Sequence, residues 1–376
     1  MRIAIHPPAT TMYNESLMSA PPAHDADEQL LAAVQEQVPL SPRPFADIAR
    51  NLDLPESLVL ERLGALRTGP HNAIRQIGAI FDSGALGYQS TLVAAKVPEN
   101  RLTAAAAAIN EHPGVSHNYR RDHEYNLWYT LAVPPDTRLG LEATAQILHR
   151  RSAAVATRLL PTLKMYKIGV KLDLDRGASD LPHSPSGKVA PAPVAHLPAV
   201  ALSQREIEFV RVLQRDLPIV QRPFDAWARE LAVSVDELLA VAEQFRLRRI
   251  MRRFSAVLRH RQLGFDANAM GVWIVPPQRQ DAFGAVAAGF SQVSHCYLRP
   301  TYQDWPYNLY TMIHARRRAE GAIILKAIAS ATGIDRYAAL FSTHEYKKVR
   351  IRYFESDIAA WERNAAAQSH VPHPLA

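Results

Sequence analysis

The sequence has only one cysteine, Cys296, among its 376 residues. A single thiol excludes an internal disulfide and any zinc or iron–sulfur site built from several cysteines. The sequence has no apolar run of 18 residues or more, which excludes an ordinary membrane-spanning helix. The first residues also lack the charged start, apolar run and cleavage site of a secretory signal. We therefore expect a cytoplasmic protein with no membrane partner.

Short catalytic motifs are also missing. The chain has no glycine-rich phosphate loop, GxSxG, HExxH or EF-hand loop, so no metal site is expected. Its charge is more informative, because Lys and Arg number 43 against 36 Asp and Glu, a net charge of +7. This balance favours a polyanionic partner, either nucleic acid, an anionic membrane surface or a small molecule with many carboxylates or phosphates.

The chain contains an internal repeat. Short motifs of the first half recur 177 to 182 residues later, as in Arg43-Pro44-Phe45 and Arg222-Pro223-Phe224, or Val115-Ser116-His117 and Val293-Ser294-His295. Such a steady offset indicates a duplicated unit. The junction over 175–200 is rich in proline and small residues, as is typical of a linker.

Each half shows the same order of elements. Three short helices, expected at 27–38, 45–52 and 56–66, indicate a helix-turn-helix module. Strands expected at 74–81, 89–97, 125–133 and 164–172, with helices at 99–111 and 139–159, suggest a ferredoxin-like βαββαβ order. The predicted fold class is α+β, a tandem duplication of helix-turn-helix plus ferredoxin-like units paired face to face. The expected domains are 25–70, 71–174, the linker 175–200, 201–248 and 249–356.

The helix-turn-helix modules favour scaffolding over DNA reading. The second expected recognition helix carries Asp236, Glu237 and Glu243, and the first has its clear cations, Arg62 and Arg67, only towards its end. Base readout relies mainly on Arg, Lys, Asn and Gln, and phosphate binding needs cations. We therefore consider a nucleic-acid partner unlikely to be the polyanion.

Positive charge is concentrated elsewhere. Seven arginines and one histidine lie between Arg246 and Arg261, with no acidic residue among them. Arg252 and Arg253 alternate across the two faces of an expected strand, so at least one should face whatever the sheet covers. Arg75 is the first-half counterpart of Arg252. A solvated cluster remains the alternative, mainly for Arg246 to Arg249.

The densest chemical signal lies between residues 116 and 130. It includes two histidines and two arginines at an expected strand-to-strand turn, namely His117, His123, Arg120 and Arg121. Histidine can exchange a proton near neutral pH. The second-half segment keeps His295 and Arg299 but is four residues longer and has no second histidine. Leu127 and Trp128 fit ordinary core, and Cys296 fits a buried filler that points away from His295.

The architecture resembles that of the Lrp/AsnC-type regulators, but these motifs are similar to those of the siroheme decarboxylase family. The resemblance, closest to a fused two-subunit form from the haem d1 pathway, covers about residues 25 to 354. Two segments carry it and match the family's two subunit types in order. The first is Ser116-His117-Asn118-Tyr119-Arg120-Arg121 with His123 and Tyr125-Asn126-Leu127-Trp128. The second is His295-Cys296-Tyr297 with Arg299-Pro300, Asp304-Trp305-Pro306-Tyr307-Asn308-Leu309 and Met312-Ile313-His314.

The resemblance implies an enzyme that converts two acetate side chains of siroheme to methyl groups without an added redox cofactor. The iron would arrive with the substrate. The implied partners are siroheme, its mono- and didecarboxylated products and other haem d1 pathway enzymes. One chain would form a pseudo-heterodimer, with a further homodimer left open. The alternatives are a DNA-binding regulator of Lrp/AsnC type and a catalytically silent tetrapyrrole carrier.

Site roles follow from this substrate as hypotheses. His117 and His123 would supply the proton and orient the reacting group, with iron ligation as a rival role for a histidine. Carboxylates would be held by cationic and hydroxyl side chains of both halves, namely Arg75, Arg120, Arg121 and Tyr125 from the first half and Arg252, Arg253, His295 and Arg299 from the second.

Overall fold

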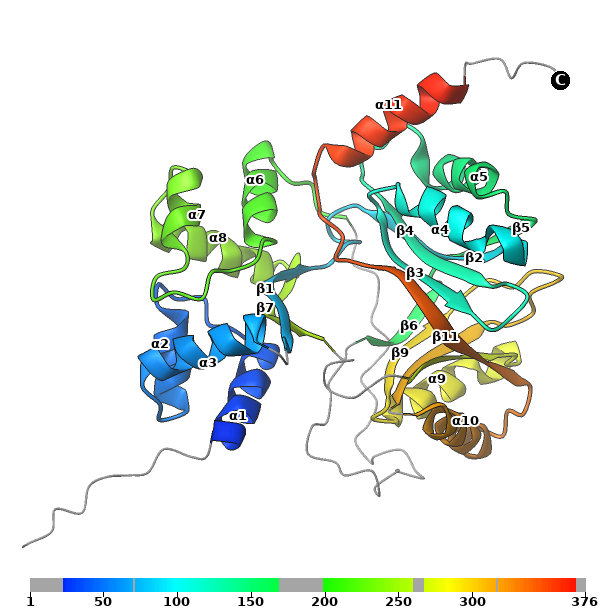
Figure 1. Cartoon of the computed structure of the whole chain (residues 1–376), viewed down its shortest axis with the longest axis horizontal. Coiled ribbons are helices and arrows are strands. Elements are labelled where there is room, and N and C mark those ends of the chain that lie inside the picture. The colour runs from blue at the N-terminus through cyan, green and yellow to red at the C-terminus, as the bar shows by residue number, and fades with distance from the viewer. Residues whose placement is uncertain (1–22, 70–71, 169–198, 260–266, 316, 370–376) are drawn as a thin grey trace, which may run out of the picture.

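The computed structural model describes residues 23–69, 72–168, 199–259, 267–315 and 317–369 (Figure 1). It confirms a duplicated α+β fold with two helical modules on one side and a large sheet on the other. No helix in these ranges is long and apolar enough to cross a membrane. Residues 260–266, which include the end of the arginine-rich segment 246–261, lie outside the described residues.

Two three-helix modules pack around a two-stranded antiparallel ribbon. The ribbon pairs β1 (Ile74–Phe81) with β7 (Met251–Leu258), one strand from each half. The apolar faces of the six helices and the ribbon share one core, which contains Phe45, Phe224 and Phe254. The six helices are α1 (Ala23–Glu36), α2 (Pro44–Asn51), α3 (Glu56–Thr68), α6 (Gln204–Leu213), α7 (Asp225–Glu230) and α8 (Val235–Leu247).

The other strands form one nine-stranded sheet that folds back on itself. Its order is β5-β2-β4-β3-β11-β8-β10-β9-β6, so four strands of each half stand in ferredoxin-like order and β6 is added as the ninth strand, beside β9. The first half supplies β2 (Gln89–Lys96), β3 (Val115–Arg121), β4 (Leu127–Val133), β5 (Ala156–Leu160) and β6 (Lys164–Ile168). The second supplies β8 (Ala267–Trp273), β9 (Val293–Leu298), β10 (Leu309–Ala315) and β11 (Tyr337–Lys348).

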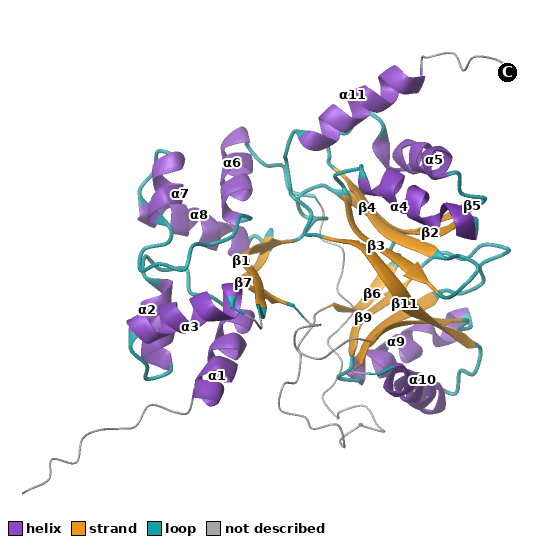
Figure 2. Cartoon of the chain, in the orientation of Figure 1, coloured by secondary structure: helices purple, strands orange, loops and turns teal. Residues whose placement is uncertain are grey.

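Helices cover the outer faces, so the inner faces of the two halves meet. The helices α4 (Leu102–Asn110) and α5 (Gly140–Ser152) pack on the first half, and α9 (Gln280–Gly289) and α10 (Arg318–Thr332) pack on the second (Figure 2). Between the inner faces lies a mixed cluster that includes Trp128 and Leu160 of the first half and Met270 and Tyr310 of the second. The predicted face-to-face pairing is therefore observed.

In addition, one strand of each half pairs with a strand of the other half. Residues Ser342 to Lys348 of β11 pair with β3, and β6 pairs with β9. The exchange joins the halves by main-chain hydrogen bonds as well as by side-chain packing.

Several expected elements were wrong. The strand at 74–81 forms, but in the ribbon rather than in the ferredoxin-like sheet, because β7 is its hydrogen-bonded partner and its apolar side chains enter the helical core. Both ferredoxin-like units therefore begin later than the expected domain starts at 71 and 249.

The bounds of later elements also differ from those expected. Residues 115–121 form β3 rather than part of a turn, and β4 begins at Leu127. The helix expected at 139–159 ends at Ser152, where Ala153 adopts a left-handed conformation before β5. The strand expected at 164–172 is confirmed over its described part, as β6 at Lys164–Ile168, and its other residues lie outside the described ranges.

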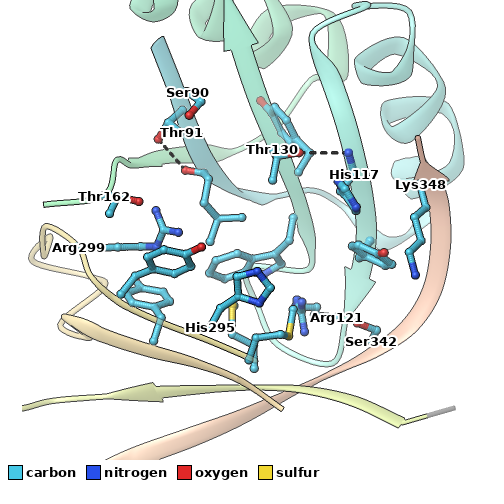
Figure 3. Close-up of a pocket in the computed structure, with 18 of the residues that line it drawn as sticks. Ser90, Thr91, His117, Arg121, Thr130, Thr162, His295, Arg299, Ser342 and Lys348 are labelled. Carbon is cyan, nitrogen blue, oxygen red and sulfur yellow. Dashed lines mark hydrogen bonds between the residues drawn. The ribbon is translucent and has the colours of Figure 1, made fainter. Parts of the chain in front are cut away.

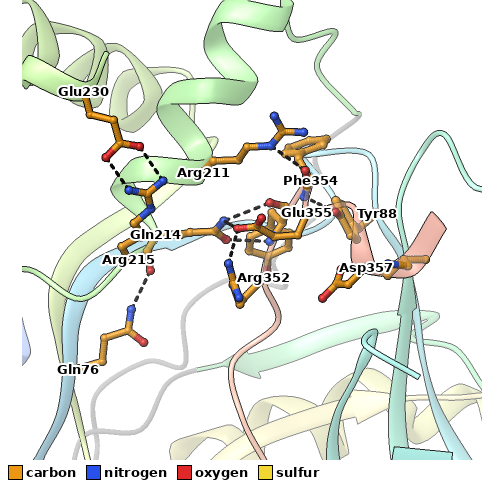
Figure 4. Close-up of polar contacts among 12 residues, drawn as sticks. Gln76, Tyr88, Arg211, Gln214, Arg215, Glu230, Arg352, Phe354, Glu355 and Asp357 are labelled. Atoms are coloured by element: carbon orange, nitrogen blue, oxygen red, sulfur yellow. Dashed lines mark hydrogen bonds and ion pairs between the residues drawn. The ribbon is translucent and has the colours of Figure 1, made fainter. Parts of the chain in front are cut away.

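The chain after β11 ties the helical modules to the sheet. Tyr353 exchanges hydrogen bonds with the Gln214 side chain of the α6 end, and Arg211 Nε donates to the Phe354 carbonyl at 2.7 Å (Figure 4). Beyond it, α11 (Asp357–Ser369) packs on the first half, where Glu362 caps the start of α5. The C-terminal helix of the second half therefore packs on the first half.

Candidate active site between the two halves

A cavity of about 410 Å³ lies between the inner faces of the sheet (Figure 3). Two equivalent strands supply its polar side chains. Because side chains alternate along an extended chain, His117, Tyr119 and Arg121 of β3 share one face, as do His295 and Tyr297 of β9 with Arg299 directly after it. All six line the cavity. Cys296 points the other way into the second-half core, as predicted.

The two triplets have nearly the same geometry. The rings of His117 and Tyr119 lie 6.2 Å apart at 30°, and those of His295 and Tyr297 lie 5.9 Å apart at 32°. Each arginine reaches from one half to the other. Arg121 Nη1 donates to the Leu340 carbonyl at 2.8 Å, and Arg299 Nη1 donates to the Leu160 carbonyl.

Both arginines are buried cations with unused hydrogen-bonding capacity. Arg121 is 4% exposed and Arg299 is 8% exposed, and the Nε of each has no hydrogen-bond partner among the described residues. Burial lowers the pKa of Arg121 to about 10 and lowers that of Arg299 as well. A buried cation without a counter-charge is unfavourable, so these two side chains are suited to an anionic ligand.

The surroundings of His117 shift its protonation. Burial first, and then the charges of Lys348 and Arg75, lower its pKa to about 4. Its Nδ1 lies 2.9 Å from Ser116 Oγ. In the free protein His117 is therefore neutral at neutral pH.

The walls between the charged groups are mostly apolar or aromatic. Leu92 and Trp128 come from the first half, and Met270, Tyr310 and Met312 come from the second. No Asp or Glu is among the described residues that line the cavity. A flat apolar molecule with several carboxylates fits this combination of walls and cations.

The long loop of the second half closes one end of this interior. Trp305 is buried against His123, Tyr125 and Trp128, and its Nε1 donates to Tyr310 Oη at 2.6 Å. On the same loop, Asp304 forms a bidentate ion pair with Arg158 of β5. We call residues 302–307 of this loop the plug, because their Trp305 is buried between the two halves.

Four of the ten predicted site residues line the cavity: His117, Arg121, His295 and Arg299. His123 does not, because it sits in the turn after β3 with its ring 5.2 Å from that of Trp305. Tyr125 Oη donates to Asp304 at 2.7 Å, outside the lining. Arg120 points to the opposite face of β3 and pairs with Glu99 at the surface.

The remaining three arginines lie on the ribbon. Arg75 is half-buried, donates to the Lys348 carbonyl and helps to lower the pKa of His117, so it lies beside the first triplet. Arg252 pairs with Asp82 at 2.7 Å. Burial lowers the pKa of the half-buried Arg253.

Sequence reasoning missed Lys348 and His314, which both line the cavity. Lys348 reaches it because the end of β11 crosses to β3, opposite His117 in the register. No sequence signal indicated that crossing. His314 follows the Met312 that pairs with His295, and the alternation of a recognised strand could have identified it.

Known proteins share both parts of this fold. The profile described as the AsnC-like ligand binding domain matches residues 85–167 and 262–347. The profile described as the siroheme decarboxylase NirDL-like HTH domain matches residues 27–69 and 206–252. The two descriptions alternate along the chain, which confirms the duplicated unit.

Three relatives illustrate the similarity. A siroheme decarboxylase of Hydrogenobacter thermophilus is 38% identical over 89% of this chain and 96% of its own. The siroheme decarboxylase beta subunit of Methanosarcina barkeri is 37% identical over 40% of this chain and 99% of its own. A crystal structure of the siroheme decarboxylase NirDL in complex with an iron-uroporphyrin III analogue superposes with a TM-score of 0.71, at 32% identity, over 91% of this chain and 99% of that one.

Proposed function

The chain belongs to the siroheme decarboxylase family in its fused NirDL form, and from that premise we propose that the cavity between its halves binds siroheme and removes two of its acetate carboxyls. The protein is accordingly a carboxy-lyase. One observation gives the strongest support to the cavity as the siroheme site. Two buried arginines face an apolar space lined by no acidic residue among the described ones.

Arg121 and Arg299 would each bind a carboxylate that is not being removed. A guanidinium can hold a carboxylate by two parallel hydrogen bonds, and both side chains have an Nε to offer. A tight clamp on the reacting carboxylate would stabilise the ground state against loss of carbon dioxide. The reacting acetate therefore lies near the imidazole of His117 and away from these two arginines.

The reaction itself balances without an oxidant. The bond between the acetate methylene and its carboxylate breaks, carbon dioxide leaves, and the electron pair stays on the methylene carbon and delocalises into the macrocycle. A proton from the His117 imidazolium then forms the new C–H bond and gives a methyl group. We propose that no further cofactor is required, and that the macrocycle's own iron is part of the substrate.

His117 must gain its proton when the substrate binds. In the free protein its pKa is about 4, because of burial and of the nearby Lys348 and Arg75. Siroheme carboxylates beside these cations would offset their effect and raise the pKa of His117. The sequence suggested a catalytic role for His123. We now propose that His123 acts indirectly, by packing against Trp305 of the plug.

An anaerobic absorbance titration with siroheme tests the cavity assignment. Replacing Arg121 or Arg299 with Met should weaken binding by about 10- to 100-fold, as expected for a lost hydrogen-bonded ion pair worth roughly 1.5–3 kcal/mol. Arg120→Met is the matched control, because Arg120 is next to Arg121 in the chain but pairs with Glu99 at the surface. Equal affinity for all four proteins would place the tetrapyrrole elsewhere.

The remaining expectations about partners stay part of this proposal. The beta subunit that matches 40% of the chain supports the view that one chain corresponds to two subunits. Transfer of the product to later enzymes of haem d1 synthesis, and a homodimer of the whole chain, are consistent with the fold and are proposed on the family resemblance alone.

A further inference from the structure

Of the histidines that line the cavity, the two at equivalent positions, His117 and His295, differ in the groups that adjoin their Nδ1 atoms. Next to His117, Ser116 Oγ lies 2.9 Å from Nδ1 and 2.8 Å from Thr130 Oγ1. The same Thr130 oxygen accepts the backbone N–H of His117 at 3.1 Å. Two hydroxyl groups in series therefore adjoin this imidazole.

At His295 the second hydroxyl is replaced by an apolar side chain. Ser294 Oγ lies 2.8 Å from His295 Nδ1 and donates to the Met312 carbonyl at 3.2 Å. Met312 pairs with His295 in the strand register as Thr130 pairs with His117. The exchange of threonine for methionine at this position makes the two triplets unequal.

The contacts of Ser294 favour one protonation state of His295 Nδ1, whereas the contacts of Ser116 allow two states of His117 Nδ1. The one hydroxyl hydrogen of Ser294 can go to His295 Nδ1 or to the Met312 carbonyl, and when it goes to the carbonyl, His295 Nδ1 is the donor in their contact. Ser116 can donate to Nδ1 while Thr130 donates to it, or accept from Nδ1 while donating to Thr130. His117 can thus gain or lose a proton at Nδ1 by rotation of two hydroxyls, with no hydrogen bond lost.

The hydroxyl groups beside His117 are also more exposed than the one beside His295. Ser116 and Thr130 are both partly exposed, whereas Ser294 is 4% exposed. Thr130 also lines the cavity, so the Ser116–Thr130 pair offers a path for a proton along the cavity wall to His117 Nδ1. At His295, Ser294 Oγ contacts the Met312 carbonyl where Ser116 Oγ contacts a second hydroxyl.

We propose that Ser116 and Thr130 are positioning residues that return a proton to His117, and that His117 alone serves both decarboxylations. This inference rests on the proposed function. If one acid serves two acetates, the monodecarboxylated intermediate has to turn in the cavity, or leave and bind again, before its second acetate reacts. The twin triplet around His295 then binds rather than protonates.

The test measures both decarboxylation steps separately, by anaerobic quenched-flow and mass spectrometry of the extracted tetrapyrrole. Thr130→Val should slow both steps by a similar factor, on the order of 10-fold or more within the range of general acid catalysis. Its siroheme affinity should stay within about twofold of wild type, the pH optimum should move to lower pH, and Thr130→Ser should restore both rates. The control is Thr157→Val, which removes a hydroxyl from another threonine–histidine pair, Thr157 Oγ1 and His149 Nδ1 at 2.9 Å, outside the cavity lining.

Three results would overturn the inference. They are Thr130→Val slowing only one step, Thr130→Val leaving both rates unchanged, and Ser294→Ala slowing one step alone, which would mean that each triplet handles its own acetate. Failure of the proposed function is distinguishable from these, since the wild-type chain would then release no carbon dioxide from siroheme at all.

Discussion

Arg121 at the end of β3 and Arg299 directly after β9 lie at equivalent positions, and each donates to a main-chain carbonyl of the opposite half, at Leu340 and Leu160 respectively. Each is buried and keeps an unpaired Nε among the described residues. The two guanidinium groups thus link the halves while facing the cavity between them. A scaffold would not need buried cations without counter-charges, and a binding site for carboxylates does.

The first prediction concerns stability without substrate. Arg121→Met removes an uncompensated buried charge and retains much of the side-chain volume, so we expect the melting temperature of the free protein to stay equal or rise. Siroheme should stabilise the wild type against heat and stabilise this variant much less. Thermal unfolding with and without siroheme measures both effects. A large loss of stability in the free variant would show that Arg121 serves the fold alone.

The second prediction is proton uptake on binding. Because the pKa of free His117 is about 4 and should rise beside substrate carboxylates, siroheme binding near neutral pH should take up close to one proton. Calorimetric titration in buffers of different ionisation enthalpy measures this number. His117→Gln should abolish the uptake, and equal uptake in that variant would assign the proton to another group.

The third prediction concerns acid stability at His112. This buried side chain accepts the Gly114 N–H at Nδ1 and packs on Trp361, and burial lowers its pKa to about 3. The unfolded state therefore binds the proton first, so its contribution to stability is complete above about pH 6.5 and is lost as the pH falls towards 3. His112→Asn keeps an acceptor for Gly114. Denaturant unfolding between pH 7 and 4 should show a shallower decline for this variant, and an unchanged slope would contradict the prediction.

The fourth prediction concerns the plug. Trp305→Ala empties a fully buried aromatic position between the halves, and such truncations typically cost about 3–5 kcal/mol of folding free energy. Trp305→Phe should cost less, and Gln303→Ala, on the exposed side of the same loop, should be close to neutral. If Trp305→Ala unfolded at the wild-type denaturant concentration, the loop would not be closing the interior.

The fifth prediction is that the helical modules do not bind duplex DNA. Glu237 and Glu243 lie on α8, and on α3 Arg67 pairs with Asp216. We expect no retardation of duplex DNA at low salt, where phosphate binding is strongest. Salt-sensitive binding by the whole chain would restore the regulator alternative.

The duplication and the fold class could be predicted because both depend on features that the sequence shows directly, namely motifs repeated at a steady offset and the order of helices and strands within each half. Arg121 was identified together with Arg120, but only the register of β3 decides which of the two faces the cavity. That strand was mistaken for a turn, so His117, Tyr119 and Arg121 were not recognised as one face. Lys348 could not be assigned at all, since it enters the site through strand exchange between halves distant in sequence.

His123 shows a second limit. A histidine near two arginines suggested catalysis, whereas the structure places its ring against Trp305 of the other half. The packing partner comes from 182 residues further along the chain, so no local pattern could reveal it.

The most direct test is anaerobic incubation of the purified chain with siroheme in D2O, followed by mass spectrometry of the tetrapyrrole. The account predicts stepwise loss of two carbon dioxides, with one solvent deuterium in each new methyl group and no change in oxidation level. Siroheme recovered unchanged, or a product formed only when an oxidant is added, would contradict it.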